Sequence, residues 1–323
     1  MPIATTVVVL VLALGLEAAF GYPAWAYERI GHPVTWIGLL IERLDRELNY
    51  EDEDATTLRA LGVLALVVIL ALSVVTGWTI ERVLAPHWIG LVALAIVTST
   101  LIASRSLYDY VRDVARALDA EGLEAARRAV SRIVGRDPQV LDEHGVVRAA
   151  IESLAENASD GVVAPAFWFF VFGLPGLVAY KAINTADSMI GHRTPRHEAF
   201  GWAAARLDDL VNLPASRLTG LLFTVAALVS SRASAREALR TMLRDAPKHR
   251  SPNAGWPESA MAGALDLKLN GPKNYGGTPV DDAYMGDGRL EAGPPDIRRA
   301  LHLASVAWCA MASVIALLAL ASG

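Results

Sequence analysis

Four long apolar runs constrain this chain more than any other feature of its sequence. They cover about residues 1–20, 58–80, 83–103 and 301–323, and Glu17 and Arg59 are the only charged side chains in them. Each run has the roughly 20 residues that an α-helix needs to cross about 30 Å of hydrocarbon. The core helix of a soluble protein would explain one such run, but not four. We therefore expect an all-α integral membrane protein with four firm transmembrane helices.

Composition agrees with this class and excludes two kinds of site. Apolar residues make up 53% of the 323 residues, more than soluble chains usually carry. The first run lacks a basic segment before it and a small-residue cleavage site after it, so it is better interpreted as an uncleaved span than as a secretory signal. The single cysteine, Cys309, rules out an internal disulfide and a cysteine-based zinc site.

Two further apolar stretches, 162–183 and 218–229, are ambiguous. The first contains Pro165 and a Gly-Leu-Pro-Gly break at 173–176, and the second is apolar for only a dozen residues. Prolines and glycines are tolerated at membrane depth where neighbouring groups satisfy the freed backbone. Both stretches are therefore expected to be additional spans or re-entrant segments, within a single membrane-embedded domain covering 1–323.

The polar connections indicate an orientation. They fall at 21–57, 81–82, 104–161, 184–217 and 230–300. With four or with six spans, the first, third and fifth share one face, and they carry 3, 8 and 11 Lys plus Arg residues. Basic residues concentrate on the cytoplasmic side, so we expect a multi-pass protein of the inner or plasma membrane with that face in the cytoplasm.

The connections are expected to be helical. Apolar residues between Ile37 and Leu48 follow helical spacing with charges opposite, which predicts an amphipathic helix. Two more apolar stripes, 107–118 and 126–133, predict helices separated near Gly122. No convincing strand pattern and no internal repeat is present.

The first group of residues that could take part in catalysis or cation binding lies in and just before 151–161. Arg148, Glu152, Glu156 and Asp160 are four residues apart, so on a regular helix they share a face. Like charges at that spacing repel, which favours a compensating Mg²⁺ ion or basic group. An ordinary solvated face balanced by Arg148 explains the pattern equally well.

The second group follows at the end of 162–183. Lys181, Asn184 and Asp187 recur every three residues, and a turn containing His192, Arg193 and Arg196 comes after Gly191. Cations beside a carboxylate and an amide suit a phosphorylated, metal-bound ligand. Anchoring of a span end by basic residues is the simpler alternative, but it does not require the asparagine, aspartate and histidine.

The remaining groups are weaker signals. Asp208, Asp209 and Asn212 offer oxygen ligands that suit Mg²⁺, although a salt bridge with Arg206 explains the acids as well. The stretch 249–265 contains Asn253 and Glu258 around the start of an expected helix, where backbone N–H groups attract anions, and a glycine-rich segment with Tyr275 follows. Neither stretch matches a nucleotide-binding fingerprint.

Several of these strings resemble signature blocks of one family. ESLAENASDGVVAP, YKAINTADSMIGHRTPRHEAFGWAAARLDDLVNLPASRL and SPNAGWPESAMAGAL, with lesser blocks SRSLYDYVRDV and NYGG, are similar in order and along the whole chain to the CobD/CbiB family, the adenosylcobinamide-phosphate synthases. His197 stands where the family has an aromatic residue.

The resemblance implies a step of cobalamin biosynthesis at the membrane. The family attaches aminopropanol, or its phosphate, through an amide to the free propionate of adenosylcobyric acid, and the ligation is taken to depend on ATP and Mg²⁺. The implied partners are membrane lipid, the corrinoid substrate, the amino alcohol and other enzymes of the pathway, one of which would supply the amine; no nucleic acid is expected.

The two lines of reasoning together give hypothetical roles. We expect catalytic roles for Glu152, Glu156, Asp160, Lys181 and His192; substrate binding by Asn157, Asn184, Arg193, Arg196, Arg206, Asn253, Glu258 and Tyr275; and Mg²⁺ binding by Asp187, Asp208 and Asp209. Because the blocks should meet one substrate, a re-entrant 162–183 segment is preferred to a full span.

Two other functions stay open from the residues alone. An intramembrane prenyltransferase also pairs acidic clusters with Mg²⁺-pyrophosphate, and Asn184, Asp187 and Asp208-Asp209 superficially fit one. A membrane scaffold or corrinoid transporter would use the charged connections as docking surfaces without consuming ATP.

Overall fold

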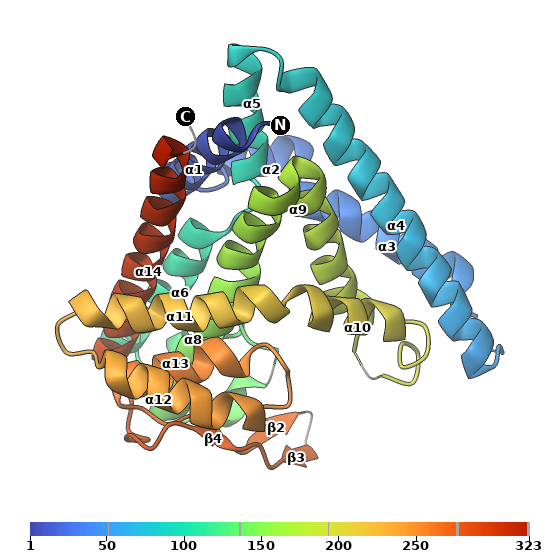
Figure 1. Ribbon diagram of the computed structural model, residues 1–323. Helices are drawn as coiled ribbons and strands as arrows, with labels where there is room; N and C mark the ends of the chain where they lie inside the picture. Colours follow the sequence, from blue (N-terminus) through green and yellow to red (C-terminus); the bar gives the residue numbers. More distant parts are fainter. Residues whose placement is uncertain (51, 136, 193, 276–277, 322–323) are drawn as a thin grey trace. The chain divides into compact units, whose positions relative to one another are not determined.

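The computed structural model describes residues 1–50, 52–135, 137–192, 194–275 and 278–321. The fold is almost entirely helical (Figure 1). Tertiary contacts divide the chain into two compact units. Unit 1 comprises Met1–Ala103, Ala164–Asn212 and Ile315–Gly323, and unit 2 comprises Ser104–Val163 and Leu213–Val314.

Unit 1 is built from seven helices in the described residues: α1 (Ile3–Phe20), α2 (Ala24–Ile30), α3 (Pro33–Leu48), α4 (Ala55–Leu84), α5 (Trp88–Ser99), α9 (Ala164–Ile190) and α10 (Trp202–Val211). Its best-defined core joins α3, α4, α9 and α10 around Ile41, Ile69, Ala186 and Phe200. The amphipathic helix predicted after Pro33 is confirmed as α3, since Ile41 is fully buried and its apolar neighbours pack on the same core.

α9 contains a break that the sequence placed correctly. Gly173 has φ 68° and ψ −156°, a conformation that only glycine adopts readily. The chain changes direction there, so the residues before and after Gly173 run along different lines (Figure 1). The second part begins Leu174-Pro175, and Leu174 N–H donates a 2.8 Å hydrogen bond to Glu81 Oε2. Whether 162–183 is a re-entrant segment or a full span stays a prediction, since Glu143–Ile190 as a whole is long and apolar enough to cross a membrane.

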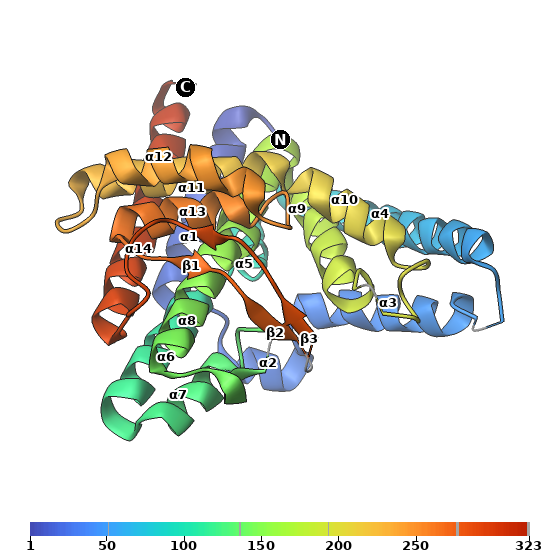
Figure 2. The ribbon, with the colours of Figure 1, turned by 90° about the horizontal axis from the view of Figure 1, so that it is seen from below.

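Unit 2 contains the other helices and all the strands of the described chain: α6 (Ser104–Glu121), α7 (Leu123–Val130), the 3₁₀ turn η1 (Pro138–Val140), α8 (Glu143–Ala158), the π-helical turn η2 (Ser159–Val163), α11 (Leu213–Val229), α12 (Ala235–Asp245), η3 (Ala246–Lys248), α13 (Gly255–Leu265), β1 (Leu269–Asn270), β2 (Lys273–Tyr275), β3 (Thr278–Val280), β4 (Tyr284–Met285) and α14 (Pro294–Ala321). Helices α11, α12 and α13 pack on one another (Figure 2). The strands form two antiparallel pairs, β1–β4 and β2–β3.

The core of unit 2 is one continuous apolar cluster. It includes the stripe predicted on 107–118, with Val111 and Val114 fully buried on α6, and the stripe on α7 that contains Ala126 and Val130. α6 ends before Gly122, whose φ is 83°, which confirms the predicted break between the two helices. α8 begins where Asp142 accepts a hydrogen bond from Gly145 N–H, an N-cap contact.

Five helical segments of the described chain are long and apolar enough to cross a membrane: Ile3–Phe20, Ala55–Leu84, Trp88–Glu121, Glu143–Ile190 and Pro294–Leu318. A sixth is reached only if α10 and α11 count as one bent span. The protein is therefore a multi-pass membrane protein, with the four firm spans, the 162–183 stretch within Glu143–Ile190, and 218–229 within the bent pair.

Two boundaries differ from the sequence prediction. Residues 81–82 were expected to be a polar connection, but α4 continues through them to Leu84 and the turn falls at 85–87. Both charges are accommodated at the helix end, where Glu81 binds Leu174 N–H and the Arg82 guanidinium lies 5.4 Å from the centre of the Trp78 ring. The predicted single domain over 1–323 stays a prediction.

Candidate functional site

A buried polar network joins α9 to α10 in unit 1. The Tyr180 hydroxyl donates to Asn212 Oδ1 at 2.9 Å, and Asn212 Nδ2 donates to Asp208 Oδ2 at 3.0 Å. Asn184 Nδ2 lies 3.4 Å from the other oxygen, Asp208 Oδ1. Tyr180 and Asn212 are 2% and 1% exposed, so this network is fixed inside the unit. Both oxygens of Asp208 therefore face amide donors, which fixes the plane of the carboxylate.

A second carboxylate lies beside the first. Asp187 is close enough to Asp208 for the two negative charges to repel each other, and Asp209 adds to the same field. Asp187 also lies against Gly191, where an added Cβ would come within 2.0 Å of Asp187 Oδ1. The absence of a side chain at 191 therefore lets the turn after α9 pass directly over this carboxylate.

Lys181 lies on the same helix as Asn184 and Asp187. It is half-buried one turn before Asn184, and its positive charge acts on His32, which lies between α2 and α3. Burial and, second, the charge of Lys181 lower the pKa of His32 below its ordinary value, although a hydrogen bond with the Thr100 backbone opposes them. His32 Nδ1 accepts from Val34 N–H at 3.2 Å. Burial and the charge of Lys181 therefore both disfavour protonation of the His32 ring.

Asp187 and Asp208 are the residues of this network that could hold a metal ion. No group of three or more His, Cys, Asp or Glu side chains in the described residues is arranged to hold a metal by itself. Mg²⁺, however, is commonly held by one or two carboxylates, with water and substrate phosphates completing its shell. Asp187 and Asp208 provide two carboxylates whose mutual repulsion a cation would relieve.

The other predicted residues of this region are placed differently. His192 is exposed in the turn after α9, and Arg193 lies outside the described residues. Arg196 is engaged with Asp45 of α3, with Nη2 3.0 Å from Asp45 Oδ2. Arg206 is exposed and reaches Asp209 at 3.7 Å, which is the salt bridge that the sequence left open as an alternative.

The first predicted group lies in unit 2, and its members do not share one environment. Glu152 is 6% exposed, and its Oε1 accepts a 2.8 Å hydrogen bond from Asn270 N–H. A solvated helix face is therefore wrong for Glu152, whereas Glu156 is exposed. Asp160 lies in the π-helical turn η2, which breaks the four-residue register on which a stack of three carboxylates depended. Such turns often occur at functional sites.

The side-chain amides of Asn157 and Asn253 are held by hydrogen bonds within unit 2. Asn157 Nδ2 donates to Ser153 O at 2.9 Å. Asn253 is 7% exposed, and its Oδ1 receives hydrogen bonds from Ser216 Oγ and Arg217 Nη1, both at 3.1 Å.

Glu258 is 3% exposed near the start of α13, with its Oε1 3.7 Å from His249 Nε2. The loop and helix around Asn253 therefore form a second buried polar group. The predicted contact of Tyr275 concerns a side chain outside the described part of the structure.

Sequence reasoning missed three partners of these groups. Tyr180 and His32 carry no motif of their own, but Tyr180 directly precedes Lys181, which is a signal that could have been used. Asp45 was interpreted as part of the polar face of α3, yet it binds both Arg196 and, at 3.3 Å, His197 Nε2. His197, which the resemblance singled out as a departure from the family pattern, therefore lies beside the Asp45 carboxylate.

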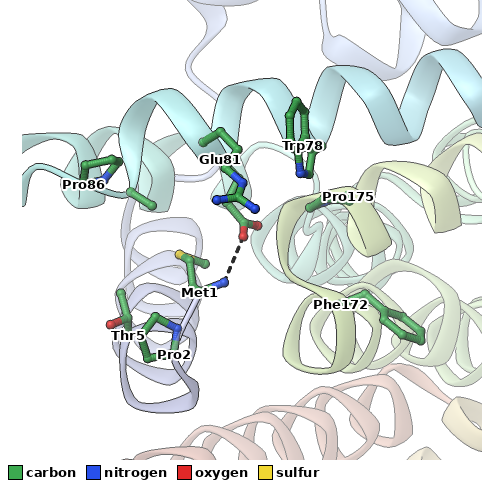
Figure 3. Close-up of a pocket in the computed structure, with 10 residues that line it drawn as sticks. Met1, Pro2, Thr5, Trp78, Glu81, Pro86, Phe172 and Pro175 are labelled. Atoms are coloured by element: carbon green, nitrogen blue, oxygen red, sulfur yellow. Dashed lines mark hydrogen bonds and ion pairs between the residues drawn. The ribbon is translucent and has the colours of Figure 1, made fainter.

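Unit 1 also contains a cavity of about 630 Å³ near the Gly173 bend. Figure 3 shows Glu81 of α4 pointing between Met1 and Pro175, with the Met1 amino group 3.3 Å from Glu81 Oε1. Trp78 and Phe172 line it as well. None of the residues predicted to be catalytic lines this cavity, so it is not part of the polar network around Asp208.

The fold and the polar groups define a class: a multi-pass helical membrane protein with paired carboxylates and amides at the end of a broken helix. Comparison with known families makes the class specific. The family described as CobD/Cbib protein matches residues 10–304. The chain belongs to the CobD/CbiB family, and its role is in cobalamin biosynthesis.

Individual relatives agree over nearly the full length. A protein of Rhodobacter capsulatus named Cobalamin biosynthesis protein CobD is 50% identical over 311 residues, covering 96% of each chain. Relatives of the same name from a Sinorhizobium species and from Rhizobium meliloti are 52% and 47% identical, covering 91% and 98% of this chain and 92% and 98% of their own. No solved structure matches the chain.

Proposed function

We propose that this protein joins aminopropanol, or aminopropanol phosphate, to the free propionate of adenosylcobyric acid, giving adenosylcobinamide or its phosphate. Membership of the CobD/CbiB family supports the pathway. The observation that carries the reaction type is the network in unit 1, where Asp187 and Asp208 lie together and Lys181 belongs to the same helix. Paired carboxylates with a nearby cation are suited to phosphate and Mg²⁺ rather than to an apolar ligand.

The chemistry requires activation of the carboxylate. A carboxylate is a poor acyl donor, so ATP transfers its terminal phosphoryl group to the propionate oxygen, giving an acyl phosphate and ADP. The amine then attacks the acyl carbon, the C–O bond to phosphate breaks, and inorganic phosphate leaves as the amide forms. The attacking nitrogen loses one proton in this step, and a base must accept it.

The chain's own residues supply binding and electrostatics. Lys181 and Arg206 are proposed to hold phosphate oxygens, together with His192 and Arg193, because phosphoryl transfer depends mainly on positioning and charge stabilisation. Asp208, oriented by Asn184 and Asn212, and Asp187 are proposed to hold Mg²⁺, with Asp209 as the third acid. Mg²⁺ would supply charge neutralisation at the transferring phosphoryl group.

The proton acceptor is proposed among groups with access to solvent. Glu152 is committed to Asn270 N–H, so it is better suited to holding the β1 segment against α8 than to accepting a proton. Glu156 and His192 are both exposed and are the candidates for the base. Asn157, Asn253 and Glu258 are proposed to position substrate amide or phosphate groups, and the active face is proposed to be cytoplasmic.

Mass spectrometry of the purified full-length protein in detergent tests the reaction. The protein is incubated with adenosylcobyric acid, ATP, Mg²⁺ and either aminopropanol or its phosphate. A product whose mass equals the corrinoid plus the amine minus water, with ADP formed in equal amount, is expected. Corrinoid recovered unchanged in stoichiometric complex would instead show a binding protein, and product without ADP would remove ATP from the scheme.

A further inference from the structure

A second cavity lies within unit 2, and none of the residues assigned above lines it. It has a volume of about 470 Å³ and lies between the end of α11, the turn into α12 and the first turns of α14. Its polar lining consists of Ser230, Ser231, Arg232, Arg298, Arg299 and His302. No carboxylate lines it, so every charged side chain in its lining is an arginine.

The acids around this cavity do not neutralise it. Arg298 pairs with Asp119 at 2.7 Å, and Arg299 shares Asp296 with Arg289. Among the described residues, no acidic side chain pairs with Arg232. Three arginines line the cavity. Asp119 balances one of them, and Asp296 is shared between Arg299 and Arg289, so the charge around the cavity is net positive.

One arginine of the lining has an unused donor. Arg299 Nη2 donates to the Arg232 carbonyl at 2.5 Å and Nη1 lies 3.0 Å from Asp296 Oδ1. Its Nε, however, is buried with no hydrogen-bond partner among the described residues. Arg299 is therefore engaged through its terminal nitrogens and its Nε is closed to a ligand, so the arginine side chains of the lining that remain for an anion are Arg232 and Arg298.

The backbone conformation at Arg232 is also unusual. Arg232 has φ +70°, a region that residues other than glycine, asparagine and aspartate rarely occupy. Arginine is a poor choice for such a turn on conformational grounds.

The surroundings of the cavity are apolar and exposed. Leu228 and Val229, the last residues of α11, are 72% and 76% exposed. The cavity also lies at the N-terminal end of the apolar segment Pro294–Leu318, one of the five that could cross a membrane. Exposed aliphatic side chains next to a basic pocket at a span end are typical of the bilayer surface, where hydrocarbon meets charged headgroups.

We infer that this cavity binds the phosphate-bearing headgroup of an anionic phospholipid. The lipid phosphate lies between Arg232 and Arg298, the Ser230 and Ser231 hydroxyls contact the rest of the headgroup, and the acyl chains follow Leu228 and Val229. The volume suits a headgroup and not a whole lipid. The site is separate from the proposed condensation and does not depend on it.

Lipid titration of the full-length protein tests this inference. Thermal unfolding, followed by tryptophan fluorescence in detergent, is measured with added phosphatidylglycerol, with phosphatidylcholine of the same acyl chains, and with inorganic phosphate. Phosphatidylglycerol is expected to raise the Tm in a saturable way, and phosphatidylcholine to have little effect. Arg232→Asn, which removes the charge and suits positive φ, should weaken the phosphatidylglycerol affinity about fivefold.

Three control variants make the result decisive. Arg232→Gly should lose affinity as Arg232→Asn does while unfolding at no lower temperature than wild type, and Arg232→Lys should largely restore binding. Arg240→Gln, on the exposed side of α12, should bind like wild type. Equal stabilisation by phosphatidylcholine, or equal loss in Arg240→Gln, would overturn the inference. Full stabilisation by inorganic phosphate alone would overturn the lipid assignment and leave a site for free phosphate.

Discussion

The Tyr180 hydroxyl and the Asn212 side-chain oxygen are joined by a 2.9 Å hydrogen bond that is buried inside unit 1. Asn212 in turn holds the Asp208 carboxylate in place, because its amide nitrogen donates a 3.0 Å hydrogen bond to it. Tyr180 therefore touches no proposed substrate, yet it helps to determine how the Asp208 carboxylate is oriented. Residues that orient a ligand in this way commonly affect activity by 10- to 100-fold when they are changed.

Tyr180→Phe should consequently lower kcat about 10-fold with little change in KM for either substrate. The variant loses one buried hydrogen bond and should unfold at a moderately lower temperature, since an unsatisfied buried acceptor costs about 1–3 kcal/mol. Tyr27→Phe, at a residue 57% exposed in the same unit, is the matched control. Equal kcat in Tyr180→Phe and wild type would separate the network from catalysis.

Asp187→Asn is expected to reduce amide formation by at least about 100-fold with the protein still folded, as removal of a group that stabilises transition-state charge commonly does. The substitution keeps the size of the side chain and removes the charge that repels Asp208. Product formation and thermal unfolding should be measured on the same sample. Ser188→Ala, at the next and exposed position of α9, should behave like wild type. Normal turnover in Asp187→Asn would contradict the proposed metal site.

The apolar runs and the amphipathic stripes predicted α1, α3 to α7 and α14, because burial follows the 3.6-residue period closely on helices such as α3 and α6, but they gave no sign of α2, α10 or α12. The break at Gly173 was also visible, since Gly-Leu-Pro-Gly cannot continue a helix unchanged. The sequence could not predict that Asn270 N–H would meet Glu152, because 118 residues separate them and no period connects a strand end with a helix. The same holds for Asp45 and Arg196, whose pairing depends on how the turn after α9 packs on α3.

The pairing of Asp45 predicts a pH dependence of stability. Burial alone would raise the pKa of Asp45, but hydrogen bonds from Asn49 and Arg196 outweigh it and hold the pKa below its ordinary value. A carboxyl whose pKa is lower in the folded than in the unfolded state stabilises the fold above the unfolded pKa, near 4, and this contribution disappears as pH falls through the folded pKa.

Asp45→Asn should therefore destabilise the protein by about 1 kcal/mol at pH 7, a figure reduced for the exposure of Arg196. The difference from wild type should shrink as the pH is lowered below about 4. Thermal unfolding between pH 7 and pH 3.5 measures it. Glu47→Gln, which removes an exposed ion pair with Arg43 on the same helix, should change little at any pH. A constant difference between Asp45→Asn and wild type would show that the charge of Asp45 is not involved.

Two variants of Glu152 test whether this carboxylate stabilises the fold or takes part in the reaction. Glu152→Gln retains an oxygen that can accept from Asn270 N–H, whereas Glu152→Ala leaves that buried donor unsatisfied. Glu152→Ala should lower the unfolding free energy by about 1–3 kcal/mol more than Glu152→Gln does, and Glu152→Gln should keep most of the activity. If Glu152→Gln abolished product formation while its stability stayed normal, Glu152 would have to be assigned to the chemistry itself.

Gly173 is the position where the bend of α9 depends on a single residue. Its φ of 68° and ψ of −156° are strained for alanine, and an added Cβ would also come within 2.3 Å of Glu81 Oε2. Gly173→Ala therefore has to change the backbone at the bend or displace Glu81 from Leu174 N–H, and either costs about 1–3 kcal/mol.

Gly15→Ala, inside α1 with no atom within 4 Å of the added Cβ, should instead be neutral or stabilising by up to about 1 kcal/mol. Thermal unfolding of the two variants in the same detergent distinguishes them. Since the bend precedes Lys181 and Asp187 on the same helix, Gly173→Ala should also lower amide formation, and an unchanged Tm and rate would show that the bend is not required.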